Sequence, residues 1–168
     1  MKCLTTRGSI LGLDMAKRIK IGNVIQILTS KGVSYAQVTH KHLRYGHLLR
    51  VFDGFYADRL DNFSEVVASS VLFSAFFPVQ KAVDEGLMAI VGNSSVSDVN
   101  SVFPTFRTSA RDRDGRRGPW WLWNGETEVM LTRGLSDEEK RYPVRGIISA
   151  PLLVERIEKG YRAETHDL

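Results

Sequence analysis

The chain has 168 residues, of which 43% are hydrophobic and 25% are charged, and its formal net charge is +4. These values are typical of one globular domain and argue against a largely disordered or membrane-spanning chain. The charge is unevenly distributed: residues 1–50 carry nine Lys and Arg against one acid, residues 51–100 carry two against seven, and residues 101–168 carry twelve against eleven. We therefore expect a basic N-terminal arm at residues 1–19 and an acidic region in the middle of the chain.

The only cysteine, Cys3, excludes an intrachain disulfide and a Cys-rich metal site, and it suits a reducing compartment. The N-terminal apolar run is interrupted by Gly12 and Asp14, and no signal-peptide cleavage site follows it. The longest apolar stretch elsewhere, Val66 to Val79, is too short for a bilayer of about 30 Å and contains a proline. These features predict a cytoplasmic protein that does not enter a membrane.

Residues 23–52 show the alternation of half-buried strands. "NVIQILT" and "VSYAQVTH" flank a turn at Ser30, Lys31 and Gly32, which predicts a hairpin. A second turn at residues 44–47 leads into "LLRVF". We therefore expect a meander of three antiparallel strands.

The next part of the chain changes to mixed helix and strand. A loop with several aspartates precedes Asn62, which together with Glu65 is the pattern of a capped helix start. "VLFSAFFP" (residues 71–78) predicts a buried strand, "VQKAVDEG" (79–86) a helix, and "LMAIVGN" (87–93) a second buried strand. The middle of the chain is therefore expected to be a strand, helix, strand unit.

Residues 93–118 are rich in Ser, Asn, Asp, Arg and Gly and predict a long irregular connection. The run "WWLWNGETEVMLTR" after it has a turn signal at Asn124 and Gly125, which predicts a hairpin. Because side chains alternate along a strand, Trp121 and Trp123 should share one face and Trp120 the other. We expect at least two of the three tryptophans to pack in the core.

The C-terminal part carries two helix signals. Ser136 and Glu139 have the spacing of a capping box, and Pro143 ends that turn. "APLLVERIEKG" (residues 150–160) has proline near its start and glycine at its end, as helices do. Together these elements predict a single α+β domain over residues 20–162, with a twisted, mostly antiparallel sheet of six or seven strands and two or three short helices, and a tail at 163–168.

Signals for catalysis are weak throughout. The sequence has no nucleophile elbow, no phosphate-binding glycine loop and no HExxH motif, so we predict no catalytic residues and no cofactor. His40 and His42 could place two imidazoles on one strand face, but no further ligand is signalled. The simpler interpretation makes them polar residues on the solvent face, and we predict no metal site.

The best candidate for partner binding is an acidic stretch next to two aromatic residues. Carboxylates supply a charge field that speeds encounter with a basic partner, and aromatic side chains supply anchors. Two arginines of the loop before the tryptophans are a second candidate contact. The predicted partner-binding residues are Asp53, Phe55, Tyr56, Asp58, Asp61, Glu65, Arg113 and Arg116.

The order of these features resembles the immunity protein 26 family of bacterial polymorphic toxin systems. The matching pieces lie between residues 20 and 161, and the more specific ones are "VGN", "WWLWNG" and the run from "RGI" to "ERI". The resemblance implies a mixed α and β domain that binds a cognate toxin and blocks it without catalysis. The acidic stretch would suit a nuclease toxin, because it can take the place of phosphates on a basic working face. The basic arm and the Arg-rich loop depart from the family pattern.

Two other classes of function stay open. A nucleic-acid-binding module would use the basic arm and the run from Arg111 to Arg117, although Asp112 and Asp114 balance half of its arginines, which makes nucleic acid the less favoured partner. A small-molecule-binding regulatory domain would need an apolar pocket near the tryptophans.

Overall fold

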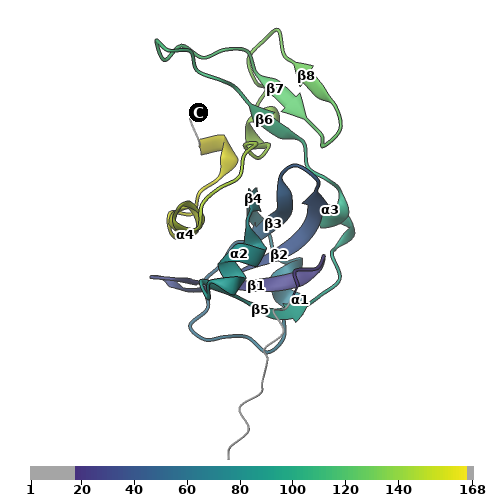
Figure 1. Cartoon of the computed structure of the whole chain (residues 1–168), viewed down its shortest axis with the longest axis vertical. Helices are drawn as coiled ribbons and strands as arrows, with labels where there is room; N and C mark the ends of the chain where they lie inside the picture. Colours follow the sequence, from purple (N-terminus) through teal and green to yellow (C-terminus); the bar gives the residue numbers. More distant parts are fainter. Residues whose placement is uncertain (1–17, 166–168) are drawn as a thin grey trace, which may run out of the picture.

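The computed structural model of the chain describes residues 18–165. Within them, eight strands form two antiparallel sheets with four short α-helices around them, so the chain is a single α+β domain (Figure 1). The predicted fold class is confirmed, but the one expected sheet is two, and the two or three expected helices are four. Residues 1–17 of the expected basic arm, and the last three residues of the expected tail, lie outside the described residues.

The larger sheet contains five strands, each antiparallel to its neighbours. Its two tight turns place Gly32 and Gly46 at positive φ, which glycine adopts without strain. The predicted meander is therefore confirmed. In spatial order the strands are β4 (Val71–Phe77), β3 (Gly46–Phe52), β2 (Gly32–His42), β1 (Asn23–Thr29) and β5 (Met88–Asn93).

The predicted strand, helix, strand unit is present as β4, α2 (Val79–Asp84) and β5. Its two strands do not lie together, because β4 pairs with β3 at one edge of the sheet and β5 pairs with β1 at the other. The prediction that β5 is a buried strand was wrong. Only Met88 in it is buried, while Ile90 and Val91 are half-buried at the borders of the apolar clusters on the two sheet faces.

One face of the large sheet is covered by α2 and by α4 (Ala150–Glu158). The hydroxyl of Ser149 accepts the N–H of Leu152 and caps α4, whose buried residues are Leu153 and Ile157. Burying an aliphatic side chain of this size contributes roughly 1.5–3 kcal/mol. The predicted C-terminal helix is confirmed, and it completes the main core.

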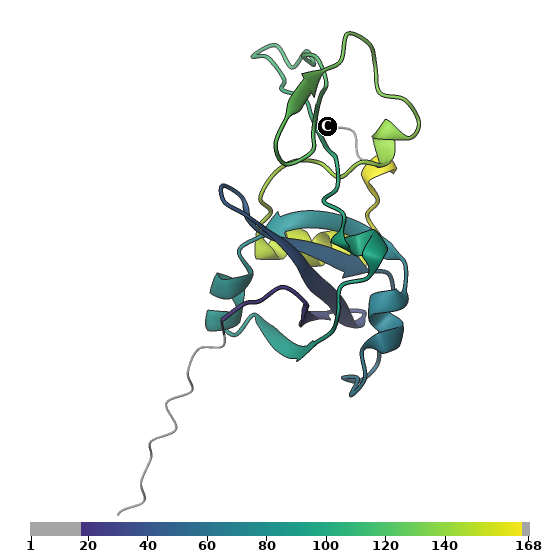
Figure 2. The same ribbon diagram turned by 90° about the vertical axis from the view of Figure 1, so that its right-hand side faces the viewer.

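The opposite face of the large sheet carries two separate apolar clusters. One packs against α1 (Ser64–Ala68) and the segment before it. The predicted cap of α1 was wrong in detail: Phe63 holds the cap position, and the Asn62 side chain accepts the N–H of Ser64 in a turn just before the helix. The second cluster joins the two sheets, and Figure 2 shows them stacked along the long axis.

The smaller sheet has the order β6 (Phe106–Thr108), β7 (Trp121–Trp123) and β8 (Glu128–Met130). The predicted hairpin of β7 and β8 is confirmed, with the Asn124 side chain accepting backbone N–H groups of its turn. The prediction of an irregular connection over residues 93–118 was wrong in part, since it contains β6 and α3 (Asp98–Ser101).

Residues 143–148 join the two sheets and form what we call the seam. Its N-terminal half pairs in parallel with β6, where Arg145 N–H donates to the carbonyl of Arg107 at 2.9 Å. Its C-terminal half pairs in parallel with β4, where Ile148 N–H donates to the carbonyl of Phe76 at 3.0 Å. The seam therefore supplies backbone hydrogen bonds to both sheets.

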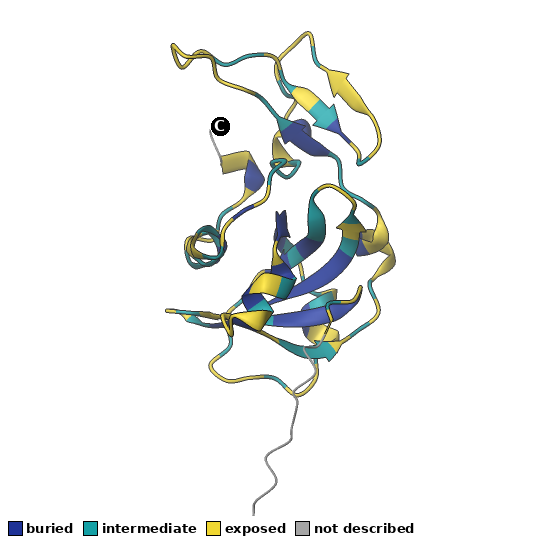
Figure 3. Ribbon diagram, viewed as in Figure 1, coloured by how far each residue is buried: buried dark blue, intermediate teal, exposed yellow. Residues whose placement is uncertain are grey.

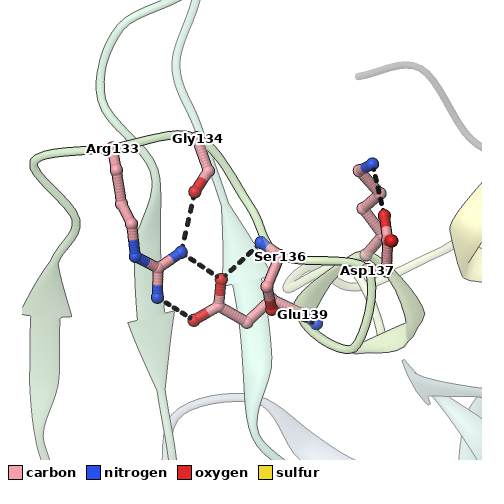
Figure 4. Close-up of polar contacts among 6 residues, drawn as sticks. Arg133, Gly134, Ser136, Asp137 and Glu139 are labelled. Atoms are coloured by element: carbon pink, nitrogen blue, oxygen red, sulfur yellow. Dashed lines mark hydrogen bonds and ion pairs between the residues drawn. The ribbon is translucent and has the colours of Figure 1, made fainter.

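The predicted capping box precedes a 3₁₀ turn, η1 (Glu139–Arg141), and is confirmed (Figure 4). Ser136 N–H donates to the Glu139 carboxylate at 2.7 Å, and Glu139 N–H donates to the Ser136 hydroxyl at 3.2 Å. Arg133 binds both carboxylate oxygens, at 2.7 and 2.9 Å. These bonds, from Arg133 above all, lower the pKa of Glu139 to about 2.

Candidate functional site

The acidic segment, which we define as residues 53–65, follows β3 and leads into α1. Asp53 at its start is paired, with its carboxylate 2.8 Å from the guanidinium of Arg162. The three later carboxylates form no ion pair with any other residue of 18–165. These exposed carboxylates are Asp58, Asp61 and Glu65.

Tyr35 of β2 holds the acidic segment against the sheet. Its hydroxyl accepts the N–H of Leu60 at 2.9 Å. The rings of Tyr56 and Phe63 each meet the Tyr35 ring edge-on with centroids 5.4 Å apart. Tyr56 and Val33 also exchange two backbone hydrogen bonds of 2.8 and 2.9 Å. The segment is therefore fixed on a strand of the main sheet.

The two aromatic residues expected as anchors differ in exposure. Phe55 is 41% exposed, and the ammonium of Lys31 lies 5.9 Å from its ring centroid. Tyr56 is half-buried, because its ring packs on Tyr35. Of this pair, Phe55 is the side chain that a partner can reach most readily.

The arginine loop, which we define as residues 109–118, connects β6 to β7. Arg113 and Arg116 are exposed in it, as expected. One oxygen of Asp112 accepts the N–H groups of Asp114 at 2.9 Å and of Arg116 at 2.8 Å. Hydrogen bonds within the loop thus fix its shape. Asp112 accepts backbone N–H groups in addition to balancing the charge of the arginines.

The predicted contact residues do not form one surface. Both ribbon views place the acidic segment beside α1, at the end of the molecule opposite to the arginine loop (Figures 1 and 2). A partner of ordinary interface size would meet one of the two groups at a time.

The prediction that at least two tryptophans lie in the core was wrong. Trp123 is buried, but Trp121 is 36% exposed. Figure 3 shows the burial of β7 changing along its length from exposed to buried. Trp120 is half-buried, with the guanidinium of Arg107 at 5.3 Å and that of Arg117 at 4.8 Å from its ring centroid. Trp121 and Trp123 lie on one face of β7, as the alternation predicted. Because β7 has only three residues, only Trp123 of the two packs against the large sheet.

His40 and His42 were expected on the solvent face, and this was also wrong. Both are half-buried and contact the ring of Phe103, and His42 also meets Trp123 edge-on at 5.0 Å. Burial lowers the pKa of His40, and the charge of Arg50 adds to this. Within residues 18–165 no group of three or more His, Cys, Asp and Glu is placed to hold a metal ion.

A pocket of about 370 Å³ lies near the tryptophans, where the small-molecule alternative requires an apolar one. Tyr45 and Trp121 line it together with the ion pair of Arg145 and Glu128. Arg145 also donates to the Tyr45 hydroxyl there, at 2.7 Å. The pocket is therefore partly charged, and its cation already has a partner.

A second pocket, of about 260 Å³, has no counterpart in the sequence predictions. We call it the basic pocket because four arginines line it. They come from β3, η1, α4 and the residue before η2 (Ala163–Thr165), so nothing in the local sequence signals it. The charged lining residues are Arg50, Arg141, Arg156, Arg162 and Glu164.

None of the helices within residues 18–165 is long and apolar enough to cross a membrane. Comparison with protein-family models, with curated proteins and with solved structures gave no match. The resemblance to the immunity protein 26 family therefore stays a prediction.

Proposed function

We propose that this chain is a non-catalytic antidote that binds a basic protein toxin through the acidic segment, in the manner that the family resemblance implies. The observation that carries the proposal is the combination of unpaired surface carboxylates with a fixed backbone. Asp58, Asp61 and Glu65 are exposed on a segment that Tyr35 holds against the sheet. A surface that is already ordered loses little conformational entropy when a partner binds.

Electrostatics favour a basic partner for this surface. Residues 53–65 contain four carboxylates and one arginine, Arg59, and Arg162 from outside the segment neutralises Asp53. The remaining negative charge would steer a positively charged partner and raise the association rate. Phe55 beside the carboxylates offers an apolar contact at the same place. A nuclease toxin, whose working face binds phosphates, has the complementary charge.

Nucleic-acid binding by the arginine loop is the weaker alternative. Arg117 lies over the ring of Trp120, and Arg111 donates to the carbonyl of Gly115 at 2.9 Å. Arg113 and Arg116 remain to contact a phosphate backbone. Two phosphate contacts give only a low affinity for nucleic acid. A filter-binding titration with duplex DNA at two salt concentrations tests this alternative directly.

The test of the antidote begins with the genome. We expect a toxin with a variable C-terminal domain to be encoded immediately upstream of this chain. Co-expression of that toxin domain with the chain should restore growth, and the purified pair should form a complex measurable by calorimetry. Failure of both rescue and binding would overturn the proposal.

Two pairs of charge reversals then locate the surface. Asp58→Arg with Asp61→Arg should weaken binding at least tenfold, mainly through slower association. Asp84→Arg with Glu85→Arg, which reverses two exposed acids at the C-terminal end of α2 on the other side of the sheet, should leave affinity nearly unchanged. Equal losses in both double variants would mean that net charge acts, and no loss in the first would exclude the acidic segment.

A further inference from the structure

The basic pocket lies along the outer edge of β4. Four consecutive residues of that strand, from Val71 to Ser74, line it, and side chains of consecutive strand residues point to opposite faces. The strand therefore presents its unpaired edge to the pocket. The remaining walls come from η1 and the residues after it, from α4 and from the chain around η2, segments that only the folded domain brings together.

Arg50 is the most unusual group in this pocket. It occupies the middle of a sheet face and lies directly across the strands from Gln37 and Ser74. Its guanidinium donates to the Ser74 hydroxyl at 3.3 Å and to the carbonyl of Val102 at 2.7 Å. No carboxylate within residues 18–165 pairs with it, and its Nε is buried without a hydrogen-bond acceptor. Burial of the guanidinium away from water also lowers the pKa of Arg50.

A charge held in this way is costly unless an anion accompanies it. Removing a guanidinium from water without a counter-charge carries a free-energy penalty, and a bound anion would offset it. Because the carbonyl and hydroxyl oxygens around Arg50 are neutral acceptors, they satisfy N–H groups but leave the positive charge uncompensated.

The other arginines reinforce this positive charge. Arg156 is held with its guanidinium 4.3 Å from the ring centroid of Tyr161, and that ring packs edge-on against Phe73. Arg141 is exposed at the pocket and forms no ion pair with a described residue. Arg162 is the one whose charge Asp53 balances. The lining thus contains three arginines without a carboxylate partner among the described residues, and its one carboxylate is Glu164.

From these contacts the geometry points to a binding site for a small phosphate monoester, with Arg50 and Arg156 on the phosphate. Guanidinium groups from several directions suit a tetrahedral oxyanion of charge near −2 better than a single planar carboxylate. Glu164 accepts hydroxyl groups of the organic part of the ligand. The volume of about 260 Å³ limits that part to the size of a pentose.

This assignment does not depend on the proposed antidote function, because no residue of the acidic segment lines the pocket, and the lining residue Arg162 is already paired with Asp53. The probes are inorganic phosphate and ribose 5-phosphate, with chloride at matched ionic strength as the control. Calorimetry on the full chain should show saturable binding of both phosphates, tighter for the ester, and both should raise Tm where chloride does not. Identical Tm shifts with chloride, and no heat of binding, would overturn the assignment.

Variants test the roles of individual residues. Arg156→Gln should weaken both phosphates at least tenfold, and Arg50→Met should abolish their binding. The matched control is Arg59→Gln, an exposed arginine of the acidic segment, which should bind normally. If Arg50→Met fails to fold, Arg156→Gln still decides the matter, since unchanged affinity in it would refute the site.

Glu164→Gln tests whether Glu164 contacts the organic part of the ligand, because ribose 5-phosphate has such a part and inorganic phosphate does not. It should weaken ribose 5-phosphate severalfold while inorganic phosphate binds equally or more tightly. Parallel changes for the two ligands would refute the role of Glu164. Binding of a 5′-phosphorylated oligonucleotide without binding of ribose 5-phosphate would overturn the small-ligand assignment in favour of a nucleic-acid end.

Discussion

At the acidic end of the molecule, residues 53–65 are held mainly by Tyr35 and apolar neighbours, with one exposed ion pair at Asp53, whereas at the opposite end aromatic rings combine with several ion pairs around β6, β7 and β8. The ion pairs near the smaller sheet include Arg133 with Glu139 and Arg145 with Glu128. Apolar contacts respond weakly to pH and salt, and ion pairs respond strongly. The acidic segment and the smaller sheet should therefore lose their structure under different conditions of pH and salt.

The largest effect should come from the aromatic cluster that attaches the smaller sheet. Trp123→Ala removes a buried ring that contacts Phe76 and Phe106, and should cost about 3–5 kcal/mol of unfolding free energy. Trp121→Ala, on the same strand face but partly exposed, removes a cross-strand pair with Met130 worth about 0.2–1 kcal/mol. Equilibrium urea unfolding of both variants gives the comparison, and equal losses would contradict it.

The next effect is the response of Glu139 to acid. Its pKa is about 2 in the folded chain against an ordinary 4.5, so its bonds stabilise the fold above pH 4.5, and this contribution disappears as pH falls towards 2. Unfolding free energy should drop over that interval in the parent chain and less steeply in Glu139→Gln. As the pH is lowered towards 3, amide exchange should rise around η1 before it rises in the acidic segment. The reverse order would show that the acidic end is the weaker one.

Tyr35→Phe should loosen the acidic segment without changing the core. The ring contacts with Tyr56 and Phe63 stay, but the N–H of Leu60 loses its acceptor, which should cost about 0.5–1.5 kcal/mol. Hydrogen exchange at Leu60 should accelerate. Unchanged exchange there would mean that the aromatic contacts alone fix the segment.

The smallest effect is expected in the arginine loop. Asp112→Ala removes the acceptor of two backbone N–H groups, but water replaces it in this exposed loop, so the cost should be about 0.5 kcal/mol. Asp112→Asn keeps an oxygen in place and should restore the loop. Chemical-shift changes confined to residues 109–118 would match this, and changes reaching Trp123 would contradict it.

Local patterns were enough to predict the first half of the large sheet. Alternating apolar residues and the glycines at positions 32 and 46 specify the meander, because both signals act within a few residues. Ser136 and Glu139 likewise predicted their turn from spacing alone. In the acidic segment the sequence located the exposed carboxylates, but it could not tell Phe55 from Tyr56, since the Tyr35 ring that covers Tyr56 lies on another strand.

The parts that could not be predicted depend on contacts between distant segments. β6 escaped detection because it is three residues long and buries Arg107 beside Phe106, so its composition resembles that of a loop. A three-residue strand also could not show that Trp123 alone meets the large sheet. The basic pocket gave no signal, because Arg50 and Arg156 are separated by most of the chain.

The seam at residues 143–148 has a consequence for the order in which the chain assembles. Strands β1, β2 and β3 pair between neighbours along the chain, and such local contacts form early. The carbonyl of Phe76 in β4, by contrast, can accept its hydrogen bond from Ile148 only after Ile148 has been synthesised. During synthesis the meander can be complete while one edge of β4 is still open and able to pair with another chain. We therefore expect aggregation during expression to depend on how quickly residues 143–148 are made after β4.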